Sequence, residues 1–173
     1  MKQQKFEIVV AQSNIDWSGR KVTGAHIGTI AIKQGELVLT DGQVSGGRFT
    51  IDTTSIKILD ITDPATNAQF AGHLASDDFF ASEQYPEALF KINSVHGTRV
   101  EGDLTIKGIT HPASFDAEVS VANDTLTAAG KIIVDRTRYG MRFRSGNFFQ
   151  NLGDTLIYND FELMVVLTAK AAA

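Results

Sequence analysis

The stretch GHLASDDFFASEQYP, residues 72–86, decides the fold, because it breaks the pattern of the chain around it. On both sides of it, apolar and polar residues alternate in the manner of β-strands. The stretch itself has no such alternation, carries the adjacent phenylalanines Phe79 and Phe80, and ends at a proline just before the alternation resumes. A single insert of this kind in an all-β chain predicts a segment that frames or covers a mouth of the fold.

The residues that lead into this stretch favour a short helix. Asp63 followed by Pro64 is typical of a helix N-cap with proline at the first helical position. Phe70 and Leu74 are four residues apart, so they share one face of such a helix. We therefore predict a short helical insert near residues 63–80.

Period-two patterns elsewhere predict β-strands with one face in a core and the other in water. In residues 113–121, for example, alanine, phenylalanine and valine alternate with serine, aspartate and glutamate. We place strands near residues 5–17, 24–33, 36–55, 88–95, 100–107, 113–121, 126–134 and 161–167. Turn residues occur at 34–35, 41–42, 96–97, 111–112 and 123–124, and Gly46 and Gly47 predict a bulge. Met164 and Val166 make the outer face of the last strand apolar, so we expect that face to be covered.

About eight antiparallel strands with few long connections favour a closed barrel over an open sheet, because closure removes exposed strand edges. We expect a single domain over residues 1–173. The interior of an eight-stranded barrel is either filled by side chains or holds one small ligand. Both outcomes remain open here, since the predicted inward faces carry several small residues, namely Gly102, Ala113, Ala117, Ala128 and Gly130.

Composition excludes several classes of protein. A net charge of -4 argues against a general binder of nucleic acid, and the absence of cysteine excludes disulfides and thiolate metal sites. No apolar run approaches the roughly 20 residues of a membrane-spanning helix. The first residues lack the pattern of a signal peptide. We therefore expect a cytoplasmic protein as the sequence stands, or a periplasmic one if a signal segment has been removed.

Five motifs along the chain are shared with a known family. They are VTG at residues 22–24 with His26 and Gly28, GRFTID at 47–52, DFF at 78–80 followed by YPEA at 85–88, GDLTIKGIT at 102–110 followed by Pro112, and DRTRYG at 135–140 with Ser145 and Gly146. In this order they resemble the motifs of the YceI-like family, from about Trp17 to the last strand. Ala81 stands where the family usually has aspartate, and Tyr139 stands where tryptophan is common.

The resemblance implies a lipocalin-like, eight-stranded barrel with a long apolar tunnel for a polyisoprenoid, an isoprenoid quinone or a fatty-acid-like lipid. We expect a bacterial lipid-binding protein that serves transport, storage or sensing, with no catalytic residue and no cofactor beyond such a lipid. A homodimer is left open. The predicted tunnel residues are Phe49, Ile51, Phe79, Phe80, Phe90, Leu104, Ile106, Phe115 and Phe143. Phe79 and Phe80 either contact the ligand or only anchor the insert.

Four arginines, at positions 136, 138, 142 and 144, have the same parity. In an extended segment their guanidinium groups point to one side and can hold an anionic headgroup, for which we select Arg142 and Arg144. The alternative is a solvated face, with Arg136 in a structural pair with Asp52 or Asp135. Gly140 can also turn the chain and split the set.

Two other functions remain as alternatives: a lipid-modifying enzyme that uses the region Arg136–Arg144, and a filled barrel that serves only as an interaction module. No Gly-x-Ser-x-Gly elbow is present. The histidines show no metal-ligand spacing, so we predict no metal site and structural or surface roles for His26, His73, His96 and His111. Trp17 is predicted to plug the core or one end of the barrel.

Overall fold

The computed structural model describes residues 2–21, 24–141 and 157–172. Its strands are β1 (Gln3–Ile8), β2 (Asn14–Lys21), β3 (Gly24–Thr40), β4 (Gln43–Ile58), β5 (Glu87–His96), β6 (Arg99–Ile106), β7 (Ile109–Ala122), β8 (Thr125–Asp135) and β9 (Ile157–Ala171). One helix, α1 (Pro64–Leu74), lies between β4 and β5, and two 3-10 turns are present, η1 (Val10–Gln12) and η2 (Arg136–Tyr139).

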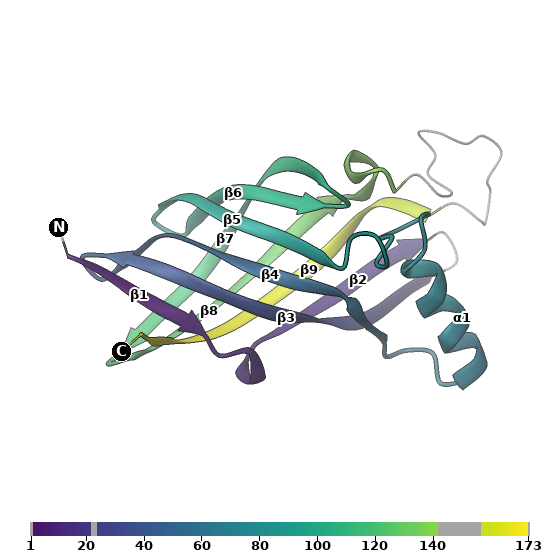
Figure 1. Cartoon of the computed structure of the whole chain (residues 1–173), viewed down its shortest axis with the longest axis horizontal. Coiled ribbons are helices and arrows are strands. Elements are labelled where there is room, and N and C mark those ends of the chain that lie inside the picture. Colours follow the sequence, from purple (N-terminus) through teal and green to yellow (C-terminus); the bar gives the residue numbers. More distant parts are fainter. Residues whose placement is uncertain (1, 22–23, 142–156, 173) are drawn as a thin grey trace.

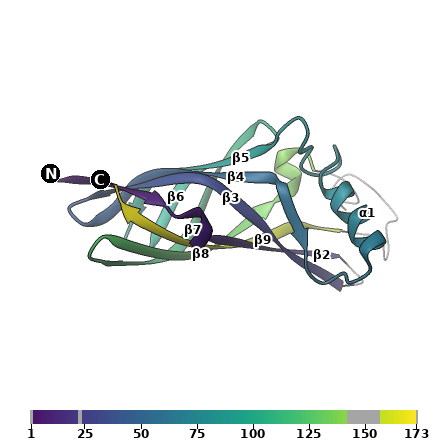
Figure 2. The same ribbon diagram turned by 60° about the horizontal axis from the view of Figure 1, so that its bottom comes forward.

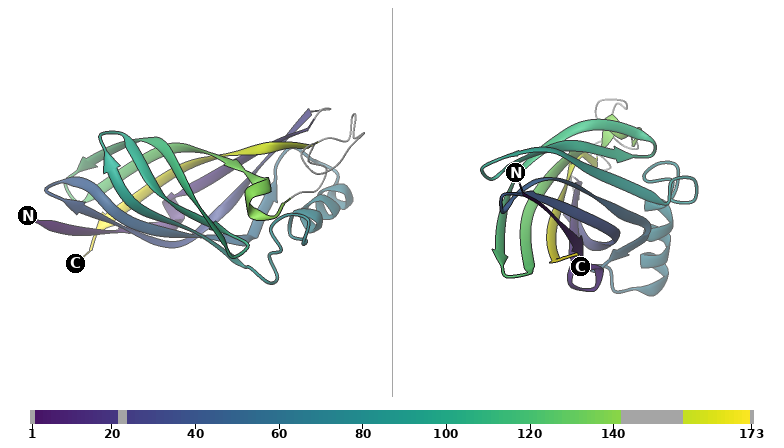
Figure 3. Two further views of the ribbon diagram at one scale, coloured as in Figure 1. Left: turned by 90° about the horizontal axis from the view of Figure 1, so that it is seen from above. Right: turned by 60° about the vertical axis from the view of Figure 1, so that its left-hand side comes forward.

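The strands form one closed antiparallel barrel (Figure 3). Each strand from β2 to β9 pairs with the next one along the chain. This includes β4 and β5, although the helix lies between them in the sequence. Strands β1 and β2 both pair with β3 and β9, so they occupy a single position in the barrel, separated by η1. The nine strand segments therefore fill eight positions, and the predicted eight-stranded antiparallel barrel is confirmed.

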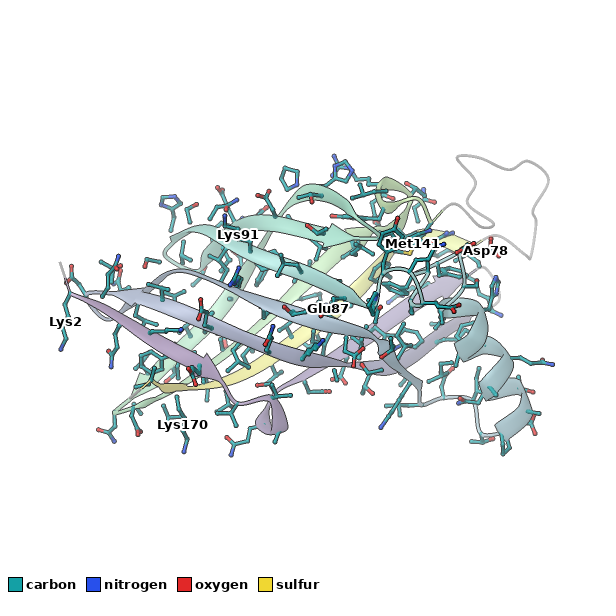
Figure 4. All side chains as sticks on the ribbon, viewed as in Figure 1. Lys2, Asp78, Glu87, Lys91, Met141 and Lys170 are labelled. Atoms are coloured by element: carbon teal, nitrogen blue, oxygen red, sulfur yellow. The ribbon has the colours of Figure 1, made fainter. Side chains whose placement is uncertain are left out.

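The two ends of the barrel differ. Helix α1 and the segment of residues 75–86, called the insert below, lie across one end, which we call the mouth (Figures 1 and 2). The first and last described strand residues lie at the opposite end, where Phe6 pairs with Ala171. Lys2 and Lys170 mark that end in Figure 4, and Asp78 marks the mouth.

The helix forms as the sequence predicts. Asp63 is its N-cap and accepts a hydrogen bond from the backbone N–H of Thr66, with Pro64 in the first turn. Leu74 is buried in the core and Phe70 packs against it, so the two share the inner face of α1. The insert then continues as a series of turns to residue 86. The helical insert predicted near residues 63–80 is confirmed.

Two predicted turns are wrong. Strand β3 continues through Gly35 to Thr40, because Gly35 serves close packing: a Cβ there would lie 2.7 Å from Phe49 Cβ. The chain reverses instead at Asp41 and Gly42. His111 and Pro112 lie inside β7, in a part of that strand that does not pair with β8. The N–H that Pro112 lacks therefore costs no hydrogen bond on the side of β8.

Other local predictions divide in the same way. The strand predicted over residues 5–17 is broken by η1, which gives β1 and β2. The bulge at Gly46 and Gly47 is confirmed, since the register between β3 and β4 shifts there. The described residues do not cover the outer face of β9, where Met164 and Val166 are 39% and 42% exposed.

Phenylalanine rings fill the middle of the barrel. Phe90 is 0% exposed and its ring lies 5.5 Å from the ring of Phe49 and 5.5 Å from that of Phe115. Two inward glycines make room for these rings. A Cβ on Gly102 would lie 2.8 Å from Phe90, and a Cβ on Gly130 would lie 2.8 Å from the ring of Phe115. At these two positions the small residues therefore serve a filled core.

We expect Gly102→Ala to destabilise the protein by about 1–3 kcal/mol, the usual cost of overpacking a core. The added Cβ would lie 2.2 Å from the carbonyl oxygen of Lys91, a backbone atom that cannot move aside cheaply. The matched control is Gly72→Ala in α1, where a Cβ meets nothing within 4 Å. That change should stabilise the protein by about 0.5–1 kcal/mol through helix propensity. Urea denaturation measures both, and a shift of the same sign in both would contradict the assignment.

Candidate functional site

An apolar cavity occupies the mouth half of the barrel. Its volume is about 120 Å³, and its wall comes from β2 to β6, from β9, and from α1 and the insert. The wall is mainly aliphatic and aromatic, with Ile30, Ile51 and Leu163 from the barrel and Phe70 and Phe80 from the segments over the mouth. Such a cavity suits an apolar chain better than a polar solute.

The pair Phe49 and Phe90 lies just beyond the residues that line the cavity, and we call this pair the floor. On β4, Ile51 and Thr53 line the cavity, and Phe49 is the next inward residue toward the far end. Phe49 pairs with Phe90 in the register of β4 and β5, next to the pair of Ile51 with Ala88. The cavity therefore ends where the phenylalanine-filled part of the barrel begins.

The predicted tunnel residues fall into three groups. Five line the cavity: Ile51, Phe79, Phe80, Leu104 and Ile106. Phe49, Phe90 and Phe115 lie outside its lining, in the filled part of the core. Phe143 lies outside the described residues, as do Arg142 and Arg144, which were predicted to hold the headgroup. Contact of any of them with a ligand stays a prediction.

The predicted set omits several wall residues. Phe161 and Leu163 have the inward parity of the last predicted strand, and Phe70 shares a helix face with Leu74, so the pattern already placed them inside. What the pattern lacks is position along the barrel axis, which decides between cavity wall and filled core. Trp17, predicted as a plug, is a partly buried wall residue whose Nε1 donates to the carbonyl of Lys57.

Hydrogen bonds to one threonine fix the insert on the barrel. The N–H of Thr53 donates to the carbonyl of Pro86, its Oγ1 donates to the carbonyl of Tyr85, and its own carbonyl accepts from Ser82 Oγ. These bonds hold the insert against β4. Ala81, which precedes Ser82 in the insert, has a left-handed φ of 46° and is 4% exposed.

Both phenylalanines of the insert face the cavity. The ring of Phe80 meets Phe161 of β9 edge-on, with centroids 6.1 Å apart. Phe79 meets His73 edge-on at 5.0 Å and lies 5.7 Å from the guanidinium carbon of Arg136. The two rings thus anchor the insert and also form part of the cavity wall.

Arg136 is a buried structural clamp. Its guanidinium donates from Nη1 to the carbonyl of Met141, from Nε to that of Tyr158, and from Nη2 to that of Ile157, at 2.6–3.0 Å. The side chain is 3% exposed, and burial lowers its pKa from the ordinary arginine value, with Asp135 acting in the opposite direction. Arg136 therefore joins the end of β8 to the start of β9 beside the cavity.

The expected row of four arginines does not form in the described part of the chain. Arg136 and Arg138 lie in η2, and Gly140 turns the chain with a φ of 79°, so the segment is not extended there. The structural role of Arg136 is as expected, but its partners are not. Within the described residues neither Asp52 nor Asp135 forms an ion pair with it, because the donors of Arg136 are directed to backbone carbonyls.

A histidine–aspartate pair lies at the cavity wall near α1. His26 of β3 lines the cavity, and its Nδ1 lies 2.8 Å from Oδ2 of Asp60. The ring packs on Phe70 with centroids 4.7 Å apart. Burial alone raises the pKa of the Asp60 carboxyl, but the hydrogen bonds with His26 and the Ile27 N–H outweigh it and hold the pKa below its usual value.

Comparison with known proteins adds the family. The YceI-like domain matches residues 6–169 of this chain. The chain belongs to the YceI-like family. UPF0312 proteins of Staphylococcus aureus, from strains bovine RF122 / ET3-1 and USA300, are 37% identical to it over 78 residues, which is 41% of this chain and 46% of each relative. The match thus spans less than half the length of these relatives.

Three solved structures share the fold. A polyisoprenoid binding domain from Saccharophagus degradans has a TM-score of 0.73 at 12% identity and covers 96% of this chain and 98% of its own. BcnA from Burkholderia cenocepacia has a TM-score of 0.69 at 19% identity, with coverages of 94% and 99%. A mutant YCEI protein of Campylobacter jejuni, solved with a monobromobimane guest, has a TM-score of 0.58 at 16% identity, with coverages of 84% and 82%.

Two kinds of feature are absent from the described residues. No described helix has the length and apolar character needed to cross a bilayer. Within the same residues, no three side chains of the histidine, cysteine, aspartate and glutamate types gather closely enough to hold a metal ion.

We expect Arg136→Met to lower the free energy of unfolding by about 3 kcal/mol, because it leaves one buried and two partly buried carbonyls without donors. The carbonyls are those of Met141, Tyr158 and Ile157. The matched control is Arg138→Met on the same turn, an exposed side chain whose loss should cost within about 0.5 kcal/mol. Thermal and urea unfolding of both variants test this, and equal small losses would remove the clamp role.

Proposed function

We propose that this protein binds a long-chain amphiphilic lipid of the polyisoprenoid class, without changing it chemically. The apolar cavity carries this proposal, because its wall offers aliphatic and aromatic side chains to a chain-like ligand. Membership in the YceI-like family supports it. So does the structural relative described as a polyisoprenoid binding domain. Transport, storage or sensing would follow from such binding.

The geometry suggests how the ligand lies. The apolar tail points to the floor made by Phe49 and Phe90, and the polar end stays at the mouth. Each buried methylene contributes about 0.8 kcal/mol, while association costs on the order of 4–15 kcal/mol. A chain of about 15 carbons is therefore needed for useful affinity. A cavity of about 120 Å³ holds only part of such a chain. Helix α1 or side chains of the wall must therefore move aside when the ligand binds.

Lipid uptake tests the proposal directly. Organic extraction of the purified protein, followed by mass spectrometry, should release a stoichiometric lipid, or the protein should take up added prenyl lipid. Leu104→Asp should reduce uptake at least tenfold, because a carboxylate in the cavity wall opposes an apolar chain. Val166→Asp, on the exposed outer face of β9, is the matched control and should not change uptake.

A second variant covers the case in which Leu104→Asp does not fold. Ala88 lines the cavity and is buried, so Ala88→Leu fills space without adding charge. It should reduce uptake of the longest chains. Recovery of no lipid from several preparations, together with no uptake by the wild type, would sink the proposal.

The floor should set the longest chain that fits. Phe90→Ala removes one ring of the floor and extends the cavity toward the filled end, so the preferred prenyl chain should lengthen by about one isoprene unit. The change should also cost about 3–5 kcal/mol of stability, and Phe90→Leu is the milder form. Phe6→Leu, at the end opposite the mouth, is the control that loses stability without changing chain length. Competition among prenyl alcohols of graded length measures this.

A further inference from the structure

His26 brings to the cavity a ring nitrogen that has no partner among the described residues. His26 lines the cavity, and its Nδ1 is bound to Oδ2 of Asp60 at 2.8 Å. Its Nε2 makes no hydrogen bond to any residue that the structure describes. The side chain is 22% exposed and packs on the ring of Phe70, so water reaches the imidazole only in part. A ligand at the mouth therefore meets a partly shielded nitrogen that still needs a partner.

Asp60 decides which kind of partner that nitrogen needs. Its Oδ1 accepts from the N–H of Ile27 at 3.1 Å, which fixes the carboxylate, and Oδ2 faces His26. An ionised carboxylate only accepts hydrogen bonds, so Nδ1 of the neutral imidazole must carry the proton. This hydrogen-bond network assigns the tautomer. In that tautomer Nε2 is a lone-pair acceptor, and the ligand has to supply the donor.

The other polar groups of the cavity are less suited to this role. Arg20, Lys21 and Arg136 carry only donors, and those of Arg136 are directed to backbone carbonyls. Asp160 and the hydroxyl of Tyr158 are acceptors that also line the cavity, but both residues are exposed, so water competes for them. The Thr53 hydroxyl is already bound to the carbonyl of Tyr85. A hydrogen bond to the shielded His26 therefore counts for more than one to Asp160.

We propose that the His26–Asp60 pair selects lipids whose polar end is a hydroxyl group, which donates to Nε2 of His26. This rests on the proposed function, because the chain of such an alcohol fills the same cavity. The hydroxyl contributes one hydrogen bond, and a chain-matched methyl ether, which has no O–H, cannot form it. The partner class is thus a long-chain alcohol.

Binding of geranylgeraniol and of its methyl ether, which share one chain, tests the proposal. The wild type should bind the alcohol roughly tenfold more tightly, as one net hydrogen bond allows. His26→Phe keeps an aromatic ring on Phe70 but has no acceptor, so both probes should then bind equally. If that variant does not fold, the ratio of alcohol to ether affinity in the wild type and in Asp60→Asn still tests the proposal.

Asp60→Asn tests the tautomer of His26 directly. With its oxygen kept on the Ile27 N–H, the new amide donates to Nδ1, so the imidazole proton moves to Nε2, which becomes a donor. The preference for the alcohol over the ether should then disappear. A purely structural role for Asp60 would not alter this ratio. The control is Asp63→Asn, a change in the N-cap of α1, which lies outside the cavity lining and should keep the wild-type ratio.

The outcomes separate the two proposals. Binding of neither probe by the wild type overturns the proposed function and this inference with it. Equal binding of alcohol and ether by the wild type leaves lipid binding intact and overturns the role of His26. A tenfold preference that persists in His26→Phe also overturns it and moves the acceptor elsewhere in the mouth.

Discussion

The space inside an eight-stranded barrel is the constraint on which the rest of this structure depends. Such a barrel is only just wide enough to be filled by side chains. Phe49, Phe90 and Phe115 fill the middle because Gly102 and Gly130 leave space for two of their rings. In the mouth half, rings such as Phe70 and Phe80 stand in the wall together with Ala88 and aliphatic residues, and they leave a cavity between them. The cavity and its floor are therefore two results of the same packing.

Polar groups around the cavity are largely satisfied by the protein itself. Arg136 is held by three carbonyls, Thr53 by the insert, and Trp17 by the carbonyl of Lys57. These bonds make the mouth stable without a ligand, and they leave few polar atoms to recognise one. Specificity then depends on chain shape and on the little that remains, of which Nε2 of His26 is the most shielded acceptor. For the lipid binding proposed above, such a cavity would favour a class of lipids over a single compound.

The sequence predicts local features well and distant ones poorly. Alternation identified the inward faces, and Asp63 with Pro64 identified the helix, because both signals lie within a few residues. The turn at Gly35 was predicted wrongly, since a glycine that permits close packing looks the same as one that permits a turn. Five residues of the predicted set line the cavity and three do not, because the parity of a strand residue says nothing about its depth along the barrel. His26 and Asp60 meet only in the fold, 34 residues apart.

Both described ends of the chain lie at the barrel end opposite the mouth (Figure 1). A tag, a surface linker or a fused domain joined to either end therefore extends from the barrel end opposite the mouth. A barrel immobilised in this way presents α1 and the insert away from the support, so the cavity stays accessible to the lipid ligand proposed above. Attachment through the chain ends is therefore the orientation in which exchange of ligand between two surfaces meets the least obstruction.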